Sequence, residues 1–290
     1  MENGVFPGPL DFPNANIPGQ ARIDALPVVI PAEEVDPSVP AGQGVEQVTV
    51  RRVLCITKRA DHTNVDDFGL VDQAENTITH FYEIIRRLKT TNYGDVLHAL
   101  QLQPDGSPNN TGSNLQLRRI FMQDPLSGGS MQNIPIAVKR SSTSLIQRQS
   151  TVSPDNPLRE IAALQFIGHH DFVMSHLECA LDHAEGQLYC CMDYYDGGEL
   201  YETVEDNNGL EEADARAYFQ QILLGLQHSH AQGVAHRDLT LENVIVKRNA
   251  VRAKIIDYGM AIRVPFIEHT GQYATLAPQG TVGKRHYMAP

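Results

Sequence analysis

Three polar side chains late in the 290-residue chain place the strongest constraint on its fold. Asp238 and Asn243 lie five residues apart, and Asp257 follows fourteen residues after Asn243, directly behind the apolar pair Ile255-Ile256. In one loop, a carboxylate can accept or orient a hydroxyl proton while an amide oxygen binds a metal ion. The apolar pair predicts a buried strand that delivers Asp257 to a second loop. We therefore expect the fold to bring both loops to one site.

Together with their neighbours, these residues resemble the catalytic loop and the metal-binding motif of eukaryotic-type protein kinases. The chain reads HRDLTLEN where the family has His-Arg-Asp-Leu-x-x-x-Asn, and DYG where it has Asp-Phe-Gly. The resemblance covers the chain from about residue 80 to residue 290. It implies ATP and Mg²⁺ as cofactors, with Asp238 accepting from the attacking hydroxyl and Asn243 and Asp257 holding the metal.

Earlier positions match the same family in the same order. The stretch Ile136-Ala137-Val138-Lys139 resembles the family strand whose lysine binds the α- and β-phosphates. Glu160, on the helix predicted next, resembles the glutamate that pairs with this lysine. Ala137 would then line the nucleotide site. A lone lysine or glutamate is usually a solvated surface charge, so the order of the motifs carries the assignment.

The strand Leu188 to Tyr194 (LYCCMDY) resembles the one that enters the hinge between the two lobes of the family. Met192 would be the gatekeeper residue, and the backbone from Asp193 to Tyr195 would bind adenine. Glu199, which follows Gly197-Gly198, resembles the residue that approaches the ribose. The resemblance therefore implies that this stretch supplies the adenine and ribose contacts.

The segment Leu88 to Val96 (LKTTNYGDV) keeps the frame of the family's Gly-rich loop but only its third glycine. Lys89 and Thr91 stand where the first two glycines would be. Because glycine lets backbone N–H groups approach phosphate closely, side chains at these positions are expected to weaken triphosphate binding. The predicted nucleotide contacts of this loop are Lys89, Tyr93, Gly94 and Val96. The long gap before Lys139 also indicates an insertion within 103–132.

Thr240 departs from the family in the catalytic loop, since Ser/Thr members have a lysine there. In the family this lysine stabilises the transferring phosphoryl group and touches a threonine of Gly-Thr-x-x-Tyr-x-Ala-Pro. Aligning residues 283–290 (GKRHYMAP) with that stretch puts Lys284 at the threonine position. The two residues would then be exchanged, and the Lys284 ammonium would supply the catalytic charge. In the alternative, Gly280-Thr281 is the true match and Lys284 is a solvated charge.

Arg237 directly precedes the catalytic aspartate, which in the family marks kinases switched by phosphorylation of the activation segment. An arginine can order such a segment by charge-assisted hydrogen bonds to a phosphate. The candidate acceptors between Asp257 and the end of the chain are Thr270, Tyr273, Thr275 and Thr281. Position in the segment favours Thr275 and Thr270.

Composition limits the other function classes. The formal net charge is −12, which argues against a nucleic-acid partner because phosphate contacts need clustered Lys and Arg. We find no signal peptide, and no stretch approaches the roughly 18 apolar residues of a membrane helix. The spacing of the cysteines matches no zinc site or disulfide framework, so we expect reduced thiols in a cytoplasmic or nuclear protein. These are Cys55, Cys179, Cys190 and Cys191.

The expected fold is α+β, a two-lobe kinase-like arrangement with a small antiparallel-sheet lobe and an incomplete helical large lobe. We expect a disordered Pro-rich tail over 1–45, a linker over 46–79, a small lobe over 80–195 and a partial large lobe over 196–290 that ends in the activation segment. The chain stops at Ala289-Pro290, before the glutamate that the family places next, so we expect it to be truncated there.

Hydrophobic periodicity predicts individual elements within this frame. Strands are predicted at 48–57, 81–88, 96–102, 134–140 and 188–195, and helices at 158–167 and 213–230. The apolar face of the last helix would contain Ala215, Phe219, Ile222, Leu223 and Leu226. A second DFG sequence ends at Gly69, but it precedes Lys139 and lies in polar sequence, so we exclude it as the metal motif.

The function implied by the resemblance is ATP-dependent phosphoryl transfer to a protein substrate. Glu242, four residues after Asp238, favours Ser/Thr hydroxyls, because tyrosine kinases usually carry arginine there. The missing glycines and Thr240 leave open a pseudokinase, a kinase-shaped binding module with little catalysis. A small-molecule phosphotransferase is a third possibility, which Arg237 and the Tyr-Met-Ala-Pro ending speak against. The sequence leaves the oligomeric state undetermined.

Overall fold

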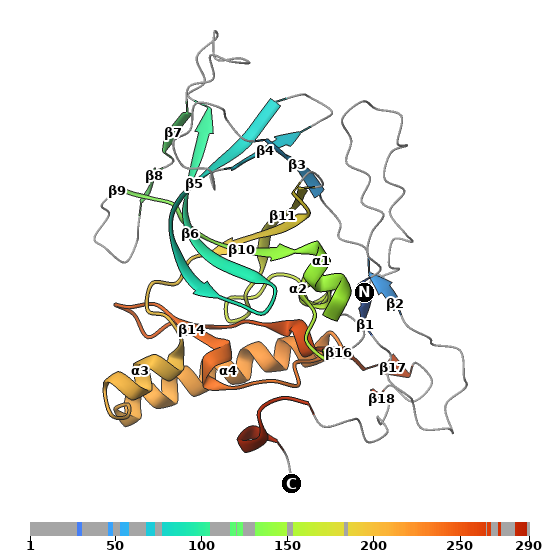
Figure 1. Cartoon of the computed structure of the whole chain (residues 1–290). Coiled ribbons are helices and arrows are strands. Elements are labelled where there is room, and N and C mark those ends of the chain that lie inside the picture. Colours follow the sequence, from blue (N-terminus) through green and yellow to red (C-terminus); the bar gives the residue numbers. More distant parts are fainter. Residues whose placement is uncertain are drawn as a thin grey trace.

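In the computed structural model of the chain, residues 77–104, 131–149, 153–182, 185–264 and 282–288 are described, together with short strands elsewhere. The described residues form a β-sheet lobe above a lobe that holds the helices α3 and α4 (Figure 1). This arrangement confirms the predicted α+β two-lobe architecture. No helix among the described residues is long and apolar enough to cross a membrane.

Five strands of the upper lobe form a continuous antiparallel part of the sheet. Four of them coincide with predicted strands, while β11 was not predicted. They are β5 (Thr77–Thr90), β6 (Gly94–Pro104), β10 (Pro135–Ser142), β11 (His176–Asp182) and β12 (Gln187–Asp193). The neighbours β5–β6, β6–β10, β10–β12 and β12–β11 all pair antiparallel, as expected for the small lobe.

Two further strands join the same sheet from the segment expected to be a linker at 46–79. β3 (Val53–Thr57) pairs with β11 in parallel, and β4 (Phe68–Asp72) connects β3 to β5. Because β10 pairs with both β12 and β6, the seven strands close into a ring of pairings. β3 falls within the strand predicted at 48–57, whereas β4 was not predicted, although its short apolar run FGLVD is long enough for a strand. The excluded DFG sequence places its Phe and Gly in β4.

Several short pairings lie outside this ring. β1 (Val28–Ile30) lies within the tail predicted to be disordered over 1–45 and pairs with β2 (Glu46–Val48), which directly follows it; the rest of the tail lies outside the described residues. In the predicted insertion, β7 (Leu117–Arg119) pairs with the end of β6, and β8 (Phe121–Gln123) pairs with β9 (Met131–Asn133).

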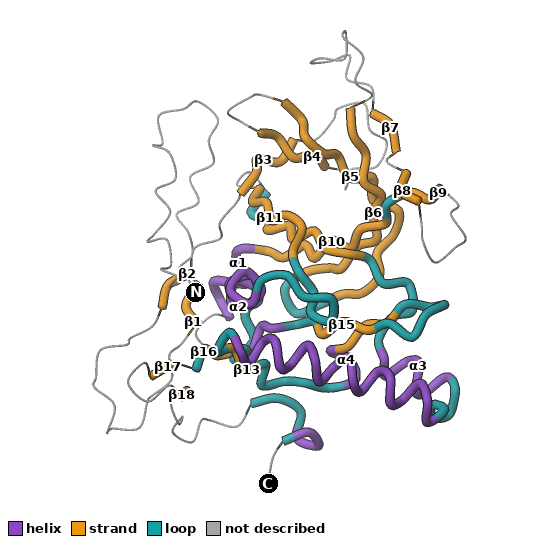
Figure 2. The backbone as a smooth tube through the Cα atoms, turned by 180° about the vertical axis from the view of Figure 1, so that it is seen from behind, coloured by secondary structure: helices purple, strands orange, loops and turns teal. Residues whose placement is uncertain are grey.

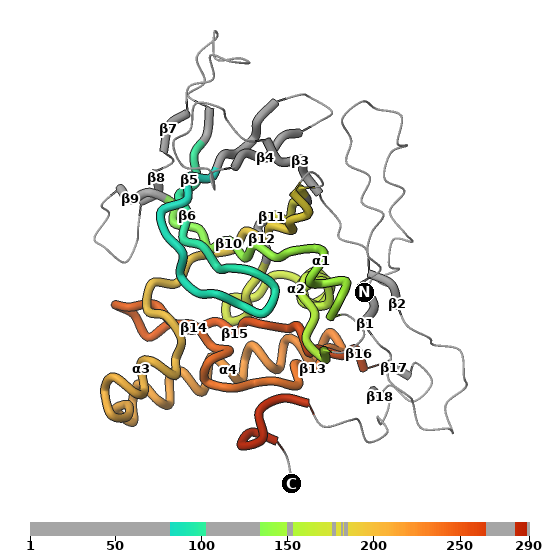
Figure 3. Tube along the Cα trace, in the orientation of Figure 1, coloured from blue at the N-terminus to red at the C-terminus, as the bar shows by residue number. Residues whose placement is uncertain are grey.

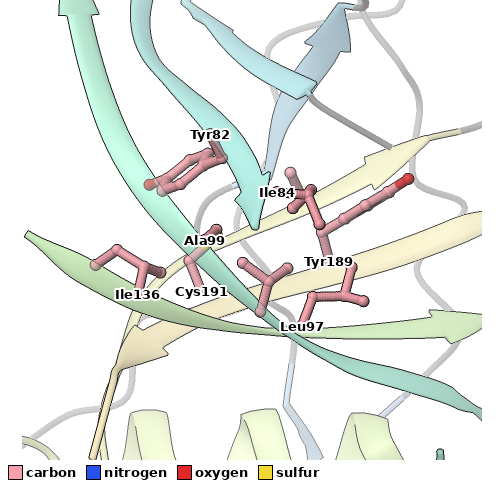
Figure 4. Packing of buried hydrophobic residues seen from close by; sticks show 9 residues of the cluster. Tyr82, Ile84, Leu97, Ala99, Ile136, Tyr189 and Cys191 are labelled. Carbon is pink, nitrogen blue, oxygen red and sulfur yellow. The ribbon is translucent and has the colours of Figure 1, made fainter. Parts of the chain in front are cut away.

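The two faces of the central strands carry different residues. Alternate side chains of β6 and β10, such as Leu97 and Val138, point into an apolar cluster with Tyr82, Tyr189 and Cys191 (Figure 4). Residues directly opposite each other in an antiparallel pair share a face. The register pairs Lys139 with Val96 and with Cys190 on the other face, which turns toward α2. The predicted nucleotide contacts of β6 and β10 therefore lie on one face.

Two helices follow β10 and cover this second face. α1 spans Thr143–Gln149, and α2 spans Pro157–Ile167. The N-terminus of α2 is fixed by Asn156, whose Oδ1 accepts the Leu158 N–H at 2.9 Å, and by Pro157, which suits the first helical position. Ile161 and Ala162 of α2 pack beneath the sheet, so the helix is held against β10 and β12.

The lower lobe is built on α3 (Leu200–Asp206) and α4 (Glu212–Ala231). α4 packs against the strand pairs β13 (Val234–Ala235) with β16 (Ile262–Arg263) and β14 (Val244–Val246) with β15 (Ala253–Ile255) (Figure 2). A further pair is formed by β17 (Phe266–Ile267) and β18 (Gln272–Tyr273). Short 3₁₀ helices occupy Leu241–Asn243, Tyr258–Met260 and Arg285–Tyr287.

The buried face of α4 agrees with the predicted one only in part, since Ile222 and Leu226 pack against the core and Phe219 and Leu223 do not. Tyr218, Gly225 and Ser229 are buried, while Phe219 is 62% exposed and Leu223 is 49% exposed. Gly225 decides the orientation, because a Cβ there would lie 2.9 Å from the Phe172 carbonyl oxygen. Because the helix approaches the core backbone at this glycine, Phe219 and Leu223 of the predicted face turn toward the surface. The hydrophobic periodicity of the sequence gives no sign of the close approach of Gly225 to the Phe172 backbone.

Candidate active site

Lys139 contacts two carboxylates of the candidate site. It lies on β10, and its Nζ is 2.5 Å from Glu160 Oε2 on α2 and 3.9 Å from Asp257 Oδ1. Burial alone would lower the pKa of Lys139, but Glu160 and Asp257 outweigh burial and raise it. The lysine therefore stays a cation, and the predicted Lys139–Glu160 pair is formed.

Asp257 follows β15 in a left-handed backbone conformation, with φ 63°. The next residue, Tyr258, is fully buried, and its hydroxyl lies 2.7 Å from Ser229 Oγ on α4. Ser229 in turn donates to the Gly225 carbonyl at 3.0 Å. Burial raises the pKa of Tyr258 to about 12. A tyrosine fits here because α4 supplies a partner for its hydroxyl, and this contact anchors the loop that carries Asp257.

The catalytic loop is tied directly to the Asp257 loop. His236 is buried, its Nε2 donates to the Ile256 carbonyl at 2.8 Å, and its Nδ1 accepts the Asp238 N–H at 3.2 Å. The Ile256 N–H donates to the Asn243 carbonyl at 3.0 Å. Burial lowers the pKa of His236, so the neutral ring serves as one donor and one acceptor. This confirms the expectation that both loops meet at one site.

Asp238 and Asn243 are in hydrogen-bond contact. Asn243 Nδ2 donates to the Asp238 carbonyl at 2.7 Å and to Asp238 Oδ2 at 3.1 Å. Since the amide nitrogen is used in this way, the side-chain oxygen of Asn243 is the atom left for a metal. Asp257 brings a carboxylate to the same region. An amide oxygen and a carboxylate are oxygen donors of the type that Mg²⁺ prefers, so this pair fits the predicted metal.

The turn between β5 and β6 is folded in beside α2 (Figure 3). Tyr93 is 2% exposed, and its hydroxyl donates to the Asp155 carbonyl at 2.5 Å. A Cβ on Gly94 would lie 2.1 Å from the Arg140 carbonyl oxygen, so only glycine fits there. Thr91 Oγ1 accepts the N–H groups of Tyr93 at 3.3 Å and Gly94 at 3.1 Å. The turn is therefore held by its own side chains and by α2.

The hinge stretch lies at the end of β12, as predicted. Met192 packs against the apolar cluster beneath the sheet. Lys254 Nζ is 3.1 Å from Asp193 Oδ2, and Lys247 Nζ donates to the Tyr194 carbonyl at 2.8 Å. Within the stretch expected to bind adenine, the structure therefore uses the middle carbonyl internally. The backbone groups of Asp193 and Tyr195 remain the candidate adenine contacts.

Lys284 faces the catalytic loop. Its backbone N–H donates to Asp238 Oδ1 at 3.1 Å, and its ammonium forms an ion pair with Glu242. The hydrogen bond from Lys284 lowers the pKa of Glu242. Thr240 is buried, 3% exposed, in the same loop. The position of Lys284 agrees with the alignment behind the proposed exchange, while its charge is directed to Glu242.

Asp155 is a site residue that the sequence patterns missed. Its Oδ1 would lie 1.9 Å from a Cβ on Gly259, so it rests against the glycine of the DYG motif. The Asn156 N–H donates to the Gly259 carbonyl at 3.0 Å. Burial, and then Asp257, raise the pKa of Asp155. No motif marks this residue, since its position depends on where α2 begins.

The predicted phosphorylation switch lies largely outside the described residues. Thr270, Thr275 and Thr281 fall there, as do Ala289-Pro290, and only the backbone of Tyr273 is described, in β18. Arg237 itself has a left-handed backbone, with φ 68°. The switch therefore stays a prediction.

Comparison with known proteins agrees with the geometry of the site. A family model described as "Protein kinase domain" matches residues 130–290. CBL-interacting protein kinase 31 of Oryza sativa subsp. japonica is 29% identical over 156 residues, which are 54% of this chain and 32% of that protein. CBL-interacting serine/threonine-protein kinase 1 of Arabidopsis thaliana is 33% identical over 132 residues, 46% of this chain and 28% of that protein.

A yeast relative shows the same pattern of partial coverage. The probable serine/threonine-protein kinase HSL1 of Saccharomyces cerevisiae is 38% identical over 125 residues, 42% of this chain and 8% of that protein. The chain thus spans about a third or less of the length of these relatives. The family match covers more than half of the chain and includes Lys139, Glu160, Asp238, Asn243 and Asp257. The chain therefore belongs to the protein kinase family.

Proposed function

We propose that the protein transfers the γ-phosphoryl group of ATP to Ser or Thr hydroxyls of a protein substrate. The single observation that carries this proposal is the meeting of three groups in one cleft. Lys139 is paired with Glu160 and lies 3.9 Å from Asp257, and the loop of Asp257 is hydrogen-bonded to the loop of Asp238 and Asn243. A cation, two metal-binding oxygens and a carboxylate base are what phosphoryl transfer requires.

Each residue has a distinct task in this proposal. The Lys139 ammonium, fixed by Glu160, would neutralise the phosphates and hold them in position. Asn243 and Asp257 would hold Mg²⁺, which supplies charge neutralisation at the transferred group when it is bound. Asp238, oriented by Asn243 Nδ2, would orient the substrate hydroxyl and accept its proton. Asp193 and Tyr195 would bind adenine through their backbone.

The preference for Ser and Thr rests on the catalytic loop. Glu242 occupies the position at which tyrosine kinases usually have arginine, and it is paired with Lys284. The names of the similar proteins from Arabidopsis thaliana and Saccharomyces cerevisiae include "serine/threonine-protein kinase", which supports the same substrate class.

Transfer of label from [γ-³²P]ATP to a Ser/Thr protein mixture, followed by phosphoamino-acid analysis, tests the proposal in the full-length protein. Label on Ser and Thr is expected, and Lys139→Met should abolish it while the fold stays intact by circular dichroism. The methionine side chain can replace the packing of the lysine stem but not its charge. Near-wild-type turnover in Lys139→Met would contradict the assignment.

A pseudokinase is the second candidate, and two contacts favour it. Lys89 is paired with Glu199, and Thr91 accepts the N–H groups of Tyr93 and Gly94, so groups expected to meet a nucleotide already have partners. Such a module would bind its partner through the kinase fold without turnover. Titration with Mg-ATP, with autophosphorylation as the readout, separates the two candidates.

A further inference from the structure

The two side chains that replace glycines in the β5–β6 turn both contact groups of the predicted nucleotide site. Lys89 lies on β5, and its ammonium forms an ion pair with Glu199, which directly precedes α3. Thr91 Oγ1 accepts hydrogen bonds from the Tyr93 and Gly94 N–H groups of the same turn. A glycine at either position could make neither contact, because both are made by side chains.

The strand register places the Lys89 contact on the nucleotide face of the sheet. Lys89 pairs with Val96, and Val96 pairs with Lys139. Directly opposite residues of antiparallel strands share a face, so all three side chains lie on the side of the sheet that turns toward α2. The Lys89–Glu199 ion pair therefore connects the sheet of the upper lobe to the residue that precedes α3 in the lower lobe.

A second contact, between the sheet and the hinge, is independent of the ion pair. The His98 ring stacks on the Tyr194 ring, with centroids 4.3 Å apart and an interplanar angle of 18°. Arg86 Nη2 lies 3.4 Å from the Tyr194 hydroxyl oxygen. Because these contacts hold β5 and β6 against Tyr194, the Lys89–Glu199 pair can open without moving the two strands away from the predicted adenine contacts.

The chemistry of the two internal contacts matches the chemistry of a nucleotide. A ribose offers hydroxyl donors to the Glu199 carboxylate, and the Lys89 ammonium is a donor that occupies this acceptor. A phosphate offers oxygen acceptors to backbone N–H groups, and the Thr91 hydroxyl is an oxygen acceptor that occupies two of them. Each side chain presents the same type of hydrogen-bonding atom as the part of the nucleotide it would exclude.

We propose that Lys89 and Thr91 are intramolecular competitors of the nucleotide, Lys89 for the ribose hydroxyls and Thr91 for the phosphates. This inference rests on the proposed nucleotide-binding function. Both residues would then be determinants of specificity. The ribose or the phosphates contribute to the binding free energy only after the free energy of the internal contact has been subtracted. The chain then discriminates weakly between nucleotides and analogues that lack these groups.

The size of the effect follows from the strength of each internal contact. The side chains of Lys89 and Glu199 are 61% and 20% exposed, and an exposed ion pair changes an equilibrium by up to about fivefold. The two neutral hydrogen bonds share the single acceptor atom Thr91 Oγ1, and we count them as one bond, which contributes about two- to tenfold. Removing a competing side chain should therefore increase, by a factor of this size, the affinity that the ribose or the phosphates contribute.

Isothermal titration of the full-length protein with three ligands tests the proposal. The ribose ratio is the Kd of 2′,3′-dideoxyadenosine divided by the Kd of adenosine, and the phosphate ratio is the Kd of adenosine divided by that of Mg²⁺-free ADP. Lys89→Met should raise the ribose ratio about two- to fivefold. Thr91→Val should raise the phosphate ratio about two- to tenfold and leave the ribose ratio unchanged.

Arg87→Met is the matched control for Lys89→Met. Arg87 lies on the same strand with a similarly exposed side chain, 65%, and faces Asp95 at 3.6 Å. Its loss should leave the ribose ratio unchanged, and an equal rise would overturn the assignment to Lys89. In the wild-type protein, raising the salt concentration should screen the ion pair and raise the ribose ratio, because both ligands of that ratio are neutral.

A ribose ratio unchanged in Lys89→Met, or a phosphate ratio unchanged in Thr91→Val, overturns the proposal for that side chain. The salt series on the wild-type protein needs no variant and decides the ribose part independently. If neither the wild type nor the variants bind adenosine, the proposed nucleotide site fails and the inference fails with it. Binding with unchanged ratios would overturn the inference alone.

Discussion

The catalytic loops and the β5–β6 turn lie across one cleft but satisfy their polar groups in different ways. In the loops, hydrogen bonds such as His236 to Ile256 orient Asp238, and its carboxylate oxygens accept one bond each, from Asn243 Nδ2 and the Lys284 N–H, which leaves lone pairs for a substrate. In the turn, the side chains of Lys89 and Thr91 use the groups that would meet the nucleotide. The same molecule thus has an assembled catalytic centre and a partly self-occupied binding turn.

The difference teaches that retained motifs and replaced motifs must be judged by what their atoms contact. Gly94 is the one glycine of the loop pattern that stays, and it stays where a Cβ would lie 2.1 Å from the Arg140 carbonyl oxygen. Lys89 and Thr91 replace glycines at positions where side chains fit. Glycine is therefore sterically required only at the end of the turn, and the other positions of the turn tolerate side chains.

The largest effect is expected for Asp238 in the catalytic loop. Asp238→Asn should lower kcat by about 10²- to 10⁴-fold, the range for loss of a positioned general base. Asp171→Asn is the matched control, since the Asp171 side chain is 65% exposed and its recorded ion pair is a 3.9 Å contact with Arg252. Steady-state kinetics on a Ser/Thr substrate give the values. Equal kcat for Asp238→Asn and wild type would break the comparison, because the loops would then be no more functional than the turn.

The next effect tests the one departure within the catalytic half. If Lys284 replaces the charge that Thr240 lacks, Lys284→Ala should lose about 2 to 4 kcal/mol of transition-state stabilisation, measured through kcat. The double variant Thr240→Lys with Lys284→Thr should recover much of this loss. Arg285→Ala is the control, because it removes the neighbouring charge. Wild-type turnover in Lys284→Ala would show that the site lacks that charge and would favour the pseudokinase.

Acid should destabilise both regions through two histidines, His236, which is buried, and His98, which is half-buried. Burial lowers the pKa of His236 in the catalytic loop, and burial and then Arg86 lower the pKa of His98 in the sheet. The unfolded chain then binds more protons, so the stability that each neutral ring contributes is full above pH 6.5 and falls as the pH drops below it. The slope is at most about 1.4 kcal/mol per pH unit for each group.

Denaturant unfolding between pH 5 and pH 8 measures this slope. His236→Asn and His98→Phe should each flatten it, and the two changes should add because the residues lie in different lobes. The variant that changes the slope of stability against pH more identifies the region that is more sensitive to acid. A curve that keeps its wild-type slope in both variants would contradict the assignment.

The smallest effect concerns the anchor beneath Asp257. Tyr258→Phe removes the hydroxyl contact with Ser229 but leaves Ser229 its bond to the Gly225 carbonyl. We expect a loss of about 1 kcal/mol in unfolding free energy, the usual value for one buried hydrogen bond. A double-mutant cycle with Ser229→Ala measures the coupling. Additive losses would show that the two hydroxyls do not interact.

Much of the site could be predicted because its residues are tied to elements with clear local signals. Lys139 lies on a strand with apolar neighbours, Glu160 follows a helix start marked by Asn156 and Pro157, and Asp257 follows an apolar pair. The site residues that were missed, Asp155 and His98, have no such motif. His98 could have been found from strand alternation, since it lies two residues after Val96 and therefore shares its face.

The sequence by itself determined the order of the elements, the motif residues and the family, because spacing and hydrophobic periodicity are local properties. Only the tertiary structure decided which face of α4 is buried, since that depends on Gly225 meeting the Phe172 carbonyl. It alone joined Lys89 to Glu199, 110 residues later in the chain. Such contacts depend on distances between segments far apart in the sequence, and no local pattern of side chains encodes them.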